Sequence, residues 1–186
     1  MKINFDIKSK LRIVLFVFFP FLVLSTGCAT FNNGTNVSPS DDSRSVVFGQ
    51  FDLNGERIDW VTFRELGPRS KIYHVPVYSG VFFHIGVPET SVQVNSFGRN
   101  HDKVLYRYDF SSAGRDLTTK DISEPGVYFM GSYKILESDS EFDVAKTRKP
   151  SEKEVLEKVL KVMLADEKLR QYEHQIGRIK ERLRQL

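Results

Sequence analysis

The stretch Val127-Tyr-Phe-Met-Gly-Ser-Tyr-Lys-Ile135 places an apolar residue or glycine at every second position, the pattern of a β-strand with one buried face. The stretch Val104-Leu-Tyr-Arg-Tyr-Asp-Phe110 repeats this alternation. Short runs of the same kind cover 45–53, 58–65, 71–78, 80–86, 91–97, 103–110 and 126–136, with a further candidate near 140–145. About seven strands at regular spacing predict a mainly β domain over residues 45–145, an antiparallel β-sandwich.

Turn residues separate these runs. Asn54-Gly55 is a dipeptide typical of two-residue β-hairpin loops, and it predicts that the strands on its two sides pair with each other. Pro125-Gly126 marks another turn, directly before the strand that contains Val127. Strands and helices do not alternate along the domain, which argues against a parallel sheet.

Residues 146–186 form a basic, amphipathic, helical C-terminal tail. Ser151 and Glu154 have the spacing of a capping box, which predicts a helix start. Apolar residues then recur at helical spacing; they are Leu169, Tyr172, Ile176, Ile179, Leu183 and Leu186. One long helix, or two helices broken near Ala165-Asp166, are both compatible with the pattern. The apolar stripe either docks on the chain's own domain or pairs with a second protein as a coiled coil.

The charge of the chain is unevenly distributed. The chain has 27 Lys and Arg residues and 24 Asp and Glu residues. Residues 1–27 contain four of the basic residues and one of the acidic residues. Residues 28–145 contain 11 basic and 16 acidic residues, and residues 146–186 contain 12 basic and 7 acidic residues. The chain after residue 27 is therefore neutral overall, and no nucleic-acid partner is predicted. The basic tail either docks on the acidic domain or attracts anionic lipid or cell-wall polymers.

The N-terminal 27 residues have the organisation of a signal peptide. A basic segment precedes a run of twelve uncharged, mostly apolar residues, 13–24, which is shorter than the roughly 20 residues that a membrane-spanning helix needs. Small residues follow, in Ser25-Thr26-Gly27-Cys28-Ala29. Residues 29–44 are polar and small, and predict a flexible tether.

This N-terminus resembles bacterial lipoprotein precursors, whose signal peptide ends in a lipobox, a group of small residues before a cysteine. The resemblance implies cleavage between Gly27 and Cys28, and acylation of Cys28 by a diacylglycerol and a fatty acid such as palmitate. Ser25 stands where the family usually has leucine. Several acyl chains on one residue anchor a protein stably to a bilayer without spanning it. Ala29, where aspartate would retain an enterobacterial lipoprotein at the inner membrane, implies an outer-membrane protein facing the periplasm.

A second resemblance concerns two turns of the β domain. Gly80-Val-Phe-Phe-His-Ile-Gly-Val-Pro88-Glu-Thr-Ser-Val-Gln-Val94 and Glu124-Pro125-Gly126-Val127-Tyr128 are similar to a hairpin of transthyretin-like and carboxypeptidase-regulatory-like β-sandwiches. The first copy has Thr90 and Val92 where the family usually has glycine and tyrosine. The second copy matches the family pattern more closely. This resemblance implies a fold and no particular activity.

Nothing in the sequence has the spacing of a catalytic or metal site. The four histidines, His74, His84, His101 and His174, lack metal-ligand spacing, and His84 is predicted on a strand surface. We therefore expect no enzyme activity, no cofactor and no bound metal. The expected role is binding or envelope assembly through another protein. The alternative is a carbohydrate- or peptidoglycan-binding module that uses exposed aromatics; the candidates are Trp60, Tyr73, Tyr78, Phe82, Tyr106 and Tyr108.

Overall fold

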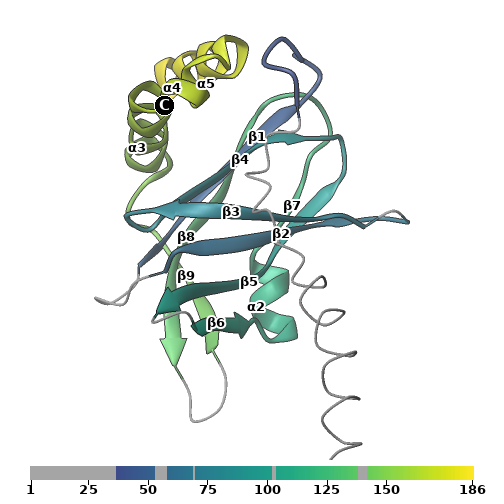
Figure 1. The fold of residues 1–186 in the computed structure, drawn as a ribbon, viewed down its shortest axis with the longest axis vertical. Helices are drawn as coiled ribbons and strands as arrows, with labels where there is room; N and C mark the ends of the chain where they lie inside the picture. The colour runs from purple at the N-terminus through teal and green to yellow at the C-terminus, as the bar shows by residue number, and fades with distance from the viewer. Residues whose placement is uncertain (1–36, 53–57, 69, 102–103, 138–141) are drawn as a thin grey trace, which may run out of the picture. The chain divides into compact units, whose positions relative to one another are not determined.

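The computed structural model describes residues 37–52, 58–68, 70–101, 104–137 and 142–186. Its elements follow one another as shown in Figure 1. In chain order they are β1 (Ser45–Asp52), β2 (Trp60–Leu66), β3 (Ile72–Tyr78), β4 (Val81–Val87), β5 (Ser91–His101), β6 (Val104–Asp109), α2 (Ser112–Leu117), β7 (Thr119–Asp121), β8 (Val127–Glu137), β9 (Phe142–Thr147), α3 (Glu152–Ala165), α4 (Glu167–Arg170) and α5 (Glu173–Gln185). The predicted strands are confirmed, and β9 lies at the further candidate near 140–145.

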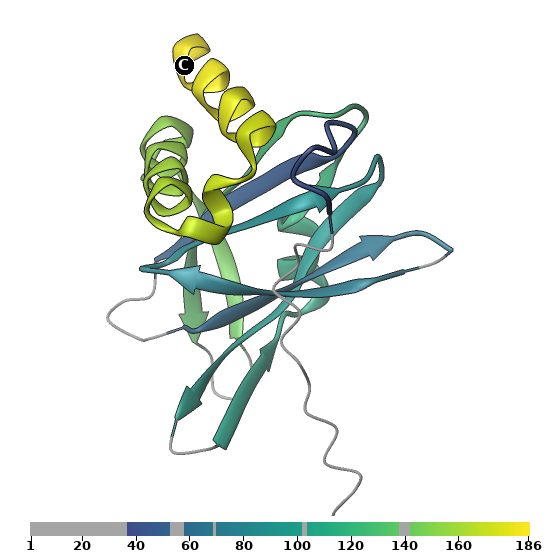
Figure 2. The same cartoon turned by 45° about the horizontal axis from the view of Figure 1, so that its top comes forward.

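The strands form one curled sheet, a half-barrel, where the sequence predicted a two-sheet sandwich (Figures 1 and 2). The strand order is β6-β5-β2-β3-β4-β1-β8-β9, and β7 pairs with β5. Strand β3 joins the two halves, because it pairs with β2 over five residues and with β4 at only two positions, Val77–Phe82 and Tyr78–Val81. The halves therefore remain hydrogen-bonded at one end of β3 and separate at the other.

The predicted hairpin around Asn54-Gly55 is wrong in its pairing, although the turn itself lies outside the described residues. Strand β1 lies between β4 and β8, and β2 lies between β3 and β5. The pairing of β1 with β8 is parallel, so the sheet is mixed. Local turn chemistry favours a hairpin, but β1 is apolar on both faces and is buried on both only in the middle of the sheet.

Helix α2 and strand β7 were not predicted, because each is too short to show a periodic pattern in the sequence. Ser111 caps α2 by accepting a hydrogen bond from the Gly114 amide. The buried Thr118 Oγ1 then donates to the Val94 carbonyl of β5 at 3.1 Å. This short helix contacts both β9 and β5, and so covers part of the space between the two ends of the curled sheet.

The inner core fills the concave side of the sheet. It combines aromatic and aliphatic side chains of both halves with residues that follow β6 and β7, and α2 borders it. The Phe51 ring is surrounded by other rings with centroids 5.0–6.1 Å away, those of Phe82, Phe97, Phe110 and Tyr133. Aromatic packing of this kind accounts for much of the buried area of a small β domain.

The outer core lies between the convex side of β1 and β4 and the C-terminal helices (Figure 2). Alternate residues of the same two strands face it, which are Val46, Phe48, Val81, Phe83 and Ile85. The helices contribute the predicted apolar stripe, including Tyr172, Ile176 and Ile179. Of the two predicted alternatives, the structure therefore shows the apolar stripe docked on the chain's own β domain.

The helical tail is broken at Asp166, between α3 and α4. This agrees with the second of the two alternatives that the sequence left open. The capping box is confirmed, because Ser151 accepts from the Glu154 amide and the Glu154 carboxylate accepts from the Ser151 amide. These hydrogen bonds hold the pKa of Glu154 below its usual value. The described residues belong to one compact unit, so the β domain and the tail are not separate bodies.

Candidate functional site

A groove of about 580 Å³ lies between the Glu124–Phe129 stretch, which contains the turn before β8, and helices α3 and α5. Its lining residues come from four elements and one turn; they are Lys120, Glu124, Pro125, Gly126, Val127, Tyr128, Phe129, Glu152, Arg178, Glu181, Arg182 and Gln185. We call this site the β8 groove. It contains one of the turns that the sequence singled out, Pro125-Gly126.

The turn at the floor of the β8 groove is fixed by three hydrogen bonds. The buried Ser45 hydroxyl donates to the Glu124 carbonyl at 3.1 Å and accepts from the Gly126 amide at 3.0 Å. The Tyr128 hydroxyl donates to the same Glu124 carbonyl at 2.8 Å. The floor is therefore preorganised, because its shape does not depend on a ligand.

The helical wall carries charges that are already engaged within the protein. Arg182 Nε donates to Glu152 Oε1 at 2.8 Å, joining α5 to the start of α3, and this hydrogen bond raises the pKa of Arg182. Arg178 donates to two main-chain carbonyls, of Arg44 at 3.0 Å and Asp42 at 2.5 Å. These arginines hold the wall in place and are only partly available to an anion.

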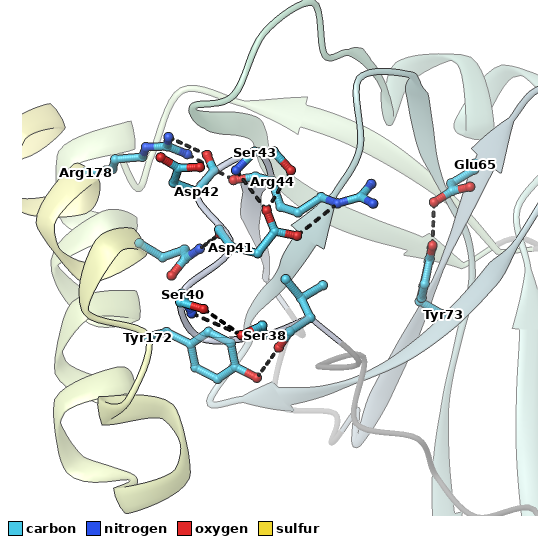
Figure 3. Close-up of polar contacts among 12 residues, drawn as sticks. Ser38, Ser40, Asp41, Asp42, Ser43, Arg44, Glu65, Tyr73, Tyr172 and Arg178 are labelled. Atoms are coloured by element: carbon cyan, nitrogen blue, oxygen red, sulfur yellow. Dashed lines mark hydrogen bonds and ion pairs between the residues drawn. The ribbon is translucent and has the colours of Figure 1, made fainter.

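Arg178 also holds residues 37–44, which we call the N-terminal strap (Figure 3). Gln175 Nε2 donates to the Asp41 carbonyl at 2.8 Å, and the Tyr172 hydroxyl donates to the Val37 carbonyl at 3.3 Å. Within the strap, Asp41 accepts from the amide and hydroxyl of Ser43, which lowers the pKa of the Asp41 carboxyl. Residues 37–44 of the predicted tether are thus held by the helical tail, which supplies donors that a local sequence pattern does not reveal.

A second cavity, of about 200 Å³, lies where β3 and β4 separate. Strand residues Tyr78 and Phe83 line it, as do Asp166, Lys168 and Tyr172 from the helices. His84 also belongs to its lining and is only 2 % exposed, contrary to the predicted surface position. The prediction failed because β4 is buried on both faces. Phe83 faces the outer core, and the His84 ring, on the other face, packs against rings of β2 and β3.

His84 is held between aromatic rings. Its ring centroid lies 4.5 Å from that of Tyr73 and 6.0 Å from that of Phe63. Burial lowers the pKa of His84 to about 4, so the imidazole is neutral at pH 7. Nearby, the Tyr73 hydroxyl donates to the Glu65 carboxylate (Figure 3), and burial together with this contact raises the pKa of Tyr73.

The aromatic residues nominated for a carbohydrate surface are not brought together. Trp60 and Phe82 are buried, and Phe82 packs in the inner core. Tyr108 stacks on Phe97 at 5.2 Å, Tyr106 lies beneath Arg99, and only Tyr78 lines one of the two cavities. The arrangement offers no row of exposed rings within the described residues.

The predicted lipidation and cleavage residues, Gly27 and Cys28, lie outside the described residues. No group of three or more His, Cys, Asp or Glu side chains with the geometry of a metal site occurs among the residues that the structure describes. Within the same part of the chain, no helix is long and apolar enough to cross a bilayer.

No family model matches the chain, and neither a curated protein nor a solved structure shows significant similarity to it. The site must therefore be interpreted from its geometry. A preorganised turn beside a helical wall whose arginines are engaged is suited to holding a ligand. Sequence reasoning found the turn but missed the wall, because Pro125 and Gln185 are far apart in the chain and share no local pattern.

Proposed function

We propose that this chain is a bacterial lipoprotein that is cleaved before Cys28, acylated on that residue, and held at the outer membrane on its periplasmic side. Its folded domain then acts by binding another envelope protein, without catalysis. The leader supports the anchor through the order of its basic segment, its apolar run of twelve residues and its small residues before the only cysteine.

The position of the N-terminal strap carries the proposal further. Since the strap is held from Val37 onward, where the Tyr172 hydroxyl binds it, only eight residues, 29–36, separate Cys28 from the folded domain. Eight residues span at most about 28 Å when extended and about 16 Å on average as a coil. The domain would thus work close to the lipid surface, within reach of membrane-embedded or membrane-bound proteins.

The β8 groove supports a binding role over a catalytic one. Its floor is fixed by Ser45 and Tyr128, and Arg178 and Arg182 are occupied by partners within the protein. A general acid or base with a shifted pKa would favour an enzyme. In this groove the pKa of Arg182 is raised by its hydrogen bond to Glu152, a contact that holds α5 to α3 and supplies no general acid or base.

Intact-mass spectrometry of the protein extracted from its native membrane tests the anchor. The expected species starts at Cys28 and carries the added mass of a diacylglycerol and one further fatty acid. The matched control is Cys28→Ala, which we expect to retain its leader or to leave the membrane fraction. A wild-type mass showing a bare sulfur, or residues 1–27 still attached, would overturn the proposal.

The binding role is tested by site-specific photocrosslinking in living cells. A photoreactive residue in place of Gln185, at the β8 groove, should give a discrete crosslinked product with an envelope protein. The same residue in place of Lys180, on the exposed side of α5, is the control and should not. Equal product patterns from the two positions would contradict a partner at the groove.

A further inference from the structure

The β8 groove follows an edge of the sheet that is left open. Strand β8 pairs with β1 from Val127 to Lys134, but with β9 only from Ser132 to Glu137. In the part of the chain that the structure describes, no strand pairs with residues 127–131 on the side away from β1. Strand β9 ends here because the chain turns into α3, and the Ser132 hydroxyl binds this turn by donating to the Pro150 carbonyl at 2.5 Å.

The direction of the main-chain groups at this edge follows from one hydrogen bond. The Val46 amide of β1 donates to the Gly126 carbonyl at 2.9 Å. In a parallel ladder, alternate residues direct their N–H and C=O groups to opposite neighbours. Since Gly126 and Tyr128 face β1, Val127 and Phe129 direct two amides and two carbonyls to the open edge.

The side chains place the β8 groove at that same edge. Val127 and Phe129 belong to the outer-core side of the sheet, whereas Tyr128 packs against the inner core. All three line the groove, which therefore extends across both faces of the strand. Lys120 of β7 and Gln185 of α5 lie along its walls. The open main-chain groups of Val127 and Phe129 consequently face the β8 groove, whose volume of about 580 Å³ can hold a peptide segment.

We propose that an extended polypeptide segment of the partner protein binds in the β8 groove as an added strand, pairing its main chain with Val127 and Phe129. Adding a strand to an open sheet edge is a general mode of peptide recognition. The charges of the groove favour a segment of low net charge, because three carboxylates and three cations line it. The engaged arginines make an anionic ligand a poorer fit. This inference rests on the proposed function and names how the partner is held.

The test uses the lipidated mature protein, which starts at Cys28, in detergent and three blocked hexapeptides of alternating threonine and valine. One is neutral, one carries lysine at both ends, and one carries glutamate at both ends. We expect the neutral peptide to bind at least as tightly as the others, and to slow amide hydrogen exchange at Val127 and Phe129. N-methylation of the peptide amides on one strand edge should weaken binding at least tenfold, and on the other edge less than twofold.

Two pairs of variants separate pairing from general disruption. Val127→Pro removes one of the open amides at the first residue of the strand, where proline is tolerated, and Val127→Ala retains it. Gln185→Trp fills the groove, and Lys180→Trp places the same ring on the exposed face of α5. We expect Val127→Pro and Gln185→Trp to bind the peptide at least tenfold more weakly than the wild type. Val127→Ala and Lys180→Trp should bind it nearly as well as the wild type. Both tryptophan variants should melt at the wild-type temperature.

Several results would overturn the inference. One is that both N-methylated peptides bind equally well. Another is that no peptide at millimolar concentration protects the amides of Val127 and Phe129 from exchange. A third is that phosphate or anionic vesicles protect these amides instead. Failure here is distinguishable from failure of the proposed function. The mass of the native protein and the crosslink from position 185 report the anchor and the partner without any assumption of strand pairing.

Discussion

The two apolar cores of this protein share strands β1 and β4 but differ in how they are closed. The inner core is enclosed mainly by the curled sheet, and Phe51 and Phe82 face it. The outer core uses the alternate residues Phe48 and Phe83, and it is closed by helices that lie more than 60 residues further along the chain. The comparison shows that the C-terminal tail is part of the fold, because strands buried on both faces require a cover on both.

Removal of the tail should have the largest effect. A chain ending at Pro150 would expose the convex faces of β1 and β4, including Val46, Phe48 and Ile85. Exposing each such side chain costs about 1.5–3 kcal/mol, so the combined loss is comparable to the usual 5–15 kcal/mol stability of a domain. We expect an insoluble or non-cooperatively unfolding product, judged by circular dichroism and thermal melting. A cooperative melt within a few degrees of the wild type would contradict the comparison.

Single truncations in the two cores should have similar costs. Phe51→Ala in the inner core should lower the free energy of unfolding by about 3–5 kcal/mol, and Leu156→Ala in the outer core by about 2–5 kcal/mol. Both side chains are fully buried. Urea unfolding followed by tryptophan fluorescence measures both, and Leu164→Ala, at an exposed position of α3, is the control. An independent tail would show no effect of Leu156→Ala on the transition of the β domain.

His84 should make stability depend on pH. Its pKa is about 4 when folded and near 6.5 when unfolded, so the unfolded chain binds the proton more readily. The contribution of neutral His84 to the free energy of unfolding is complete above pH 6.5. It is lost as the pH falls toward 4, and the total loss is about 3 kcal/mol. We expect a smaller loss of stability between pH 7 and pH 4 in His84→Phe than in the wild type. Parallel pH profiles for the two proteins would show that His84 is not buried as a neutral group.

Release of the N-terminal strap should have a smaller effect. Arg178→Ala removes two hydrogen bonds to the carbonyls of Asp42 and Arg44, and should cost about 1–3 kcal/mol. Faster amide exchange in residues 38–44 would show that the strap has detached. Arg184→Ala, whose exposed pair with Glu181 contributes at most about 1 kcal/mol, is the matched control on α5. Equal effects of the two substitutions would contradict the role of Arg178.

The strands illustrate how far the sequence alone leads. Alternation at Val104–Phe110 and Val127–Ile135 located β6 and β8, because a half-buried strand has a period of two residues. The capping box at Ser151 was also predicted, since it depends on residues close in the chain, whereas the break near Asp166 was one of two alternatives that the sequence left open. Residues 112–121 contain α2 and β7, which the sequence did not predict, because elements this short contain too few residues for a periodic pattern.

The sequence by itself determined most of the segments that become strands and helices and the neutral charge after residue 27, and it is the sole basis of the predicted anchor at Cys28. Only the tertiary structure decided that β1 pairs with β4 and β8, that His84 is buried, that the strap is held by α5, and that Val127 and Phe129 face an open edge. Local propensity acts over a few residues, whereas strand neighbours are selected by burial of apolar surface across the whole chain. The β8 groove arises from that selection, at the point where β9 turns away from β8.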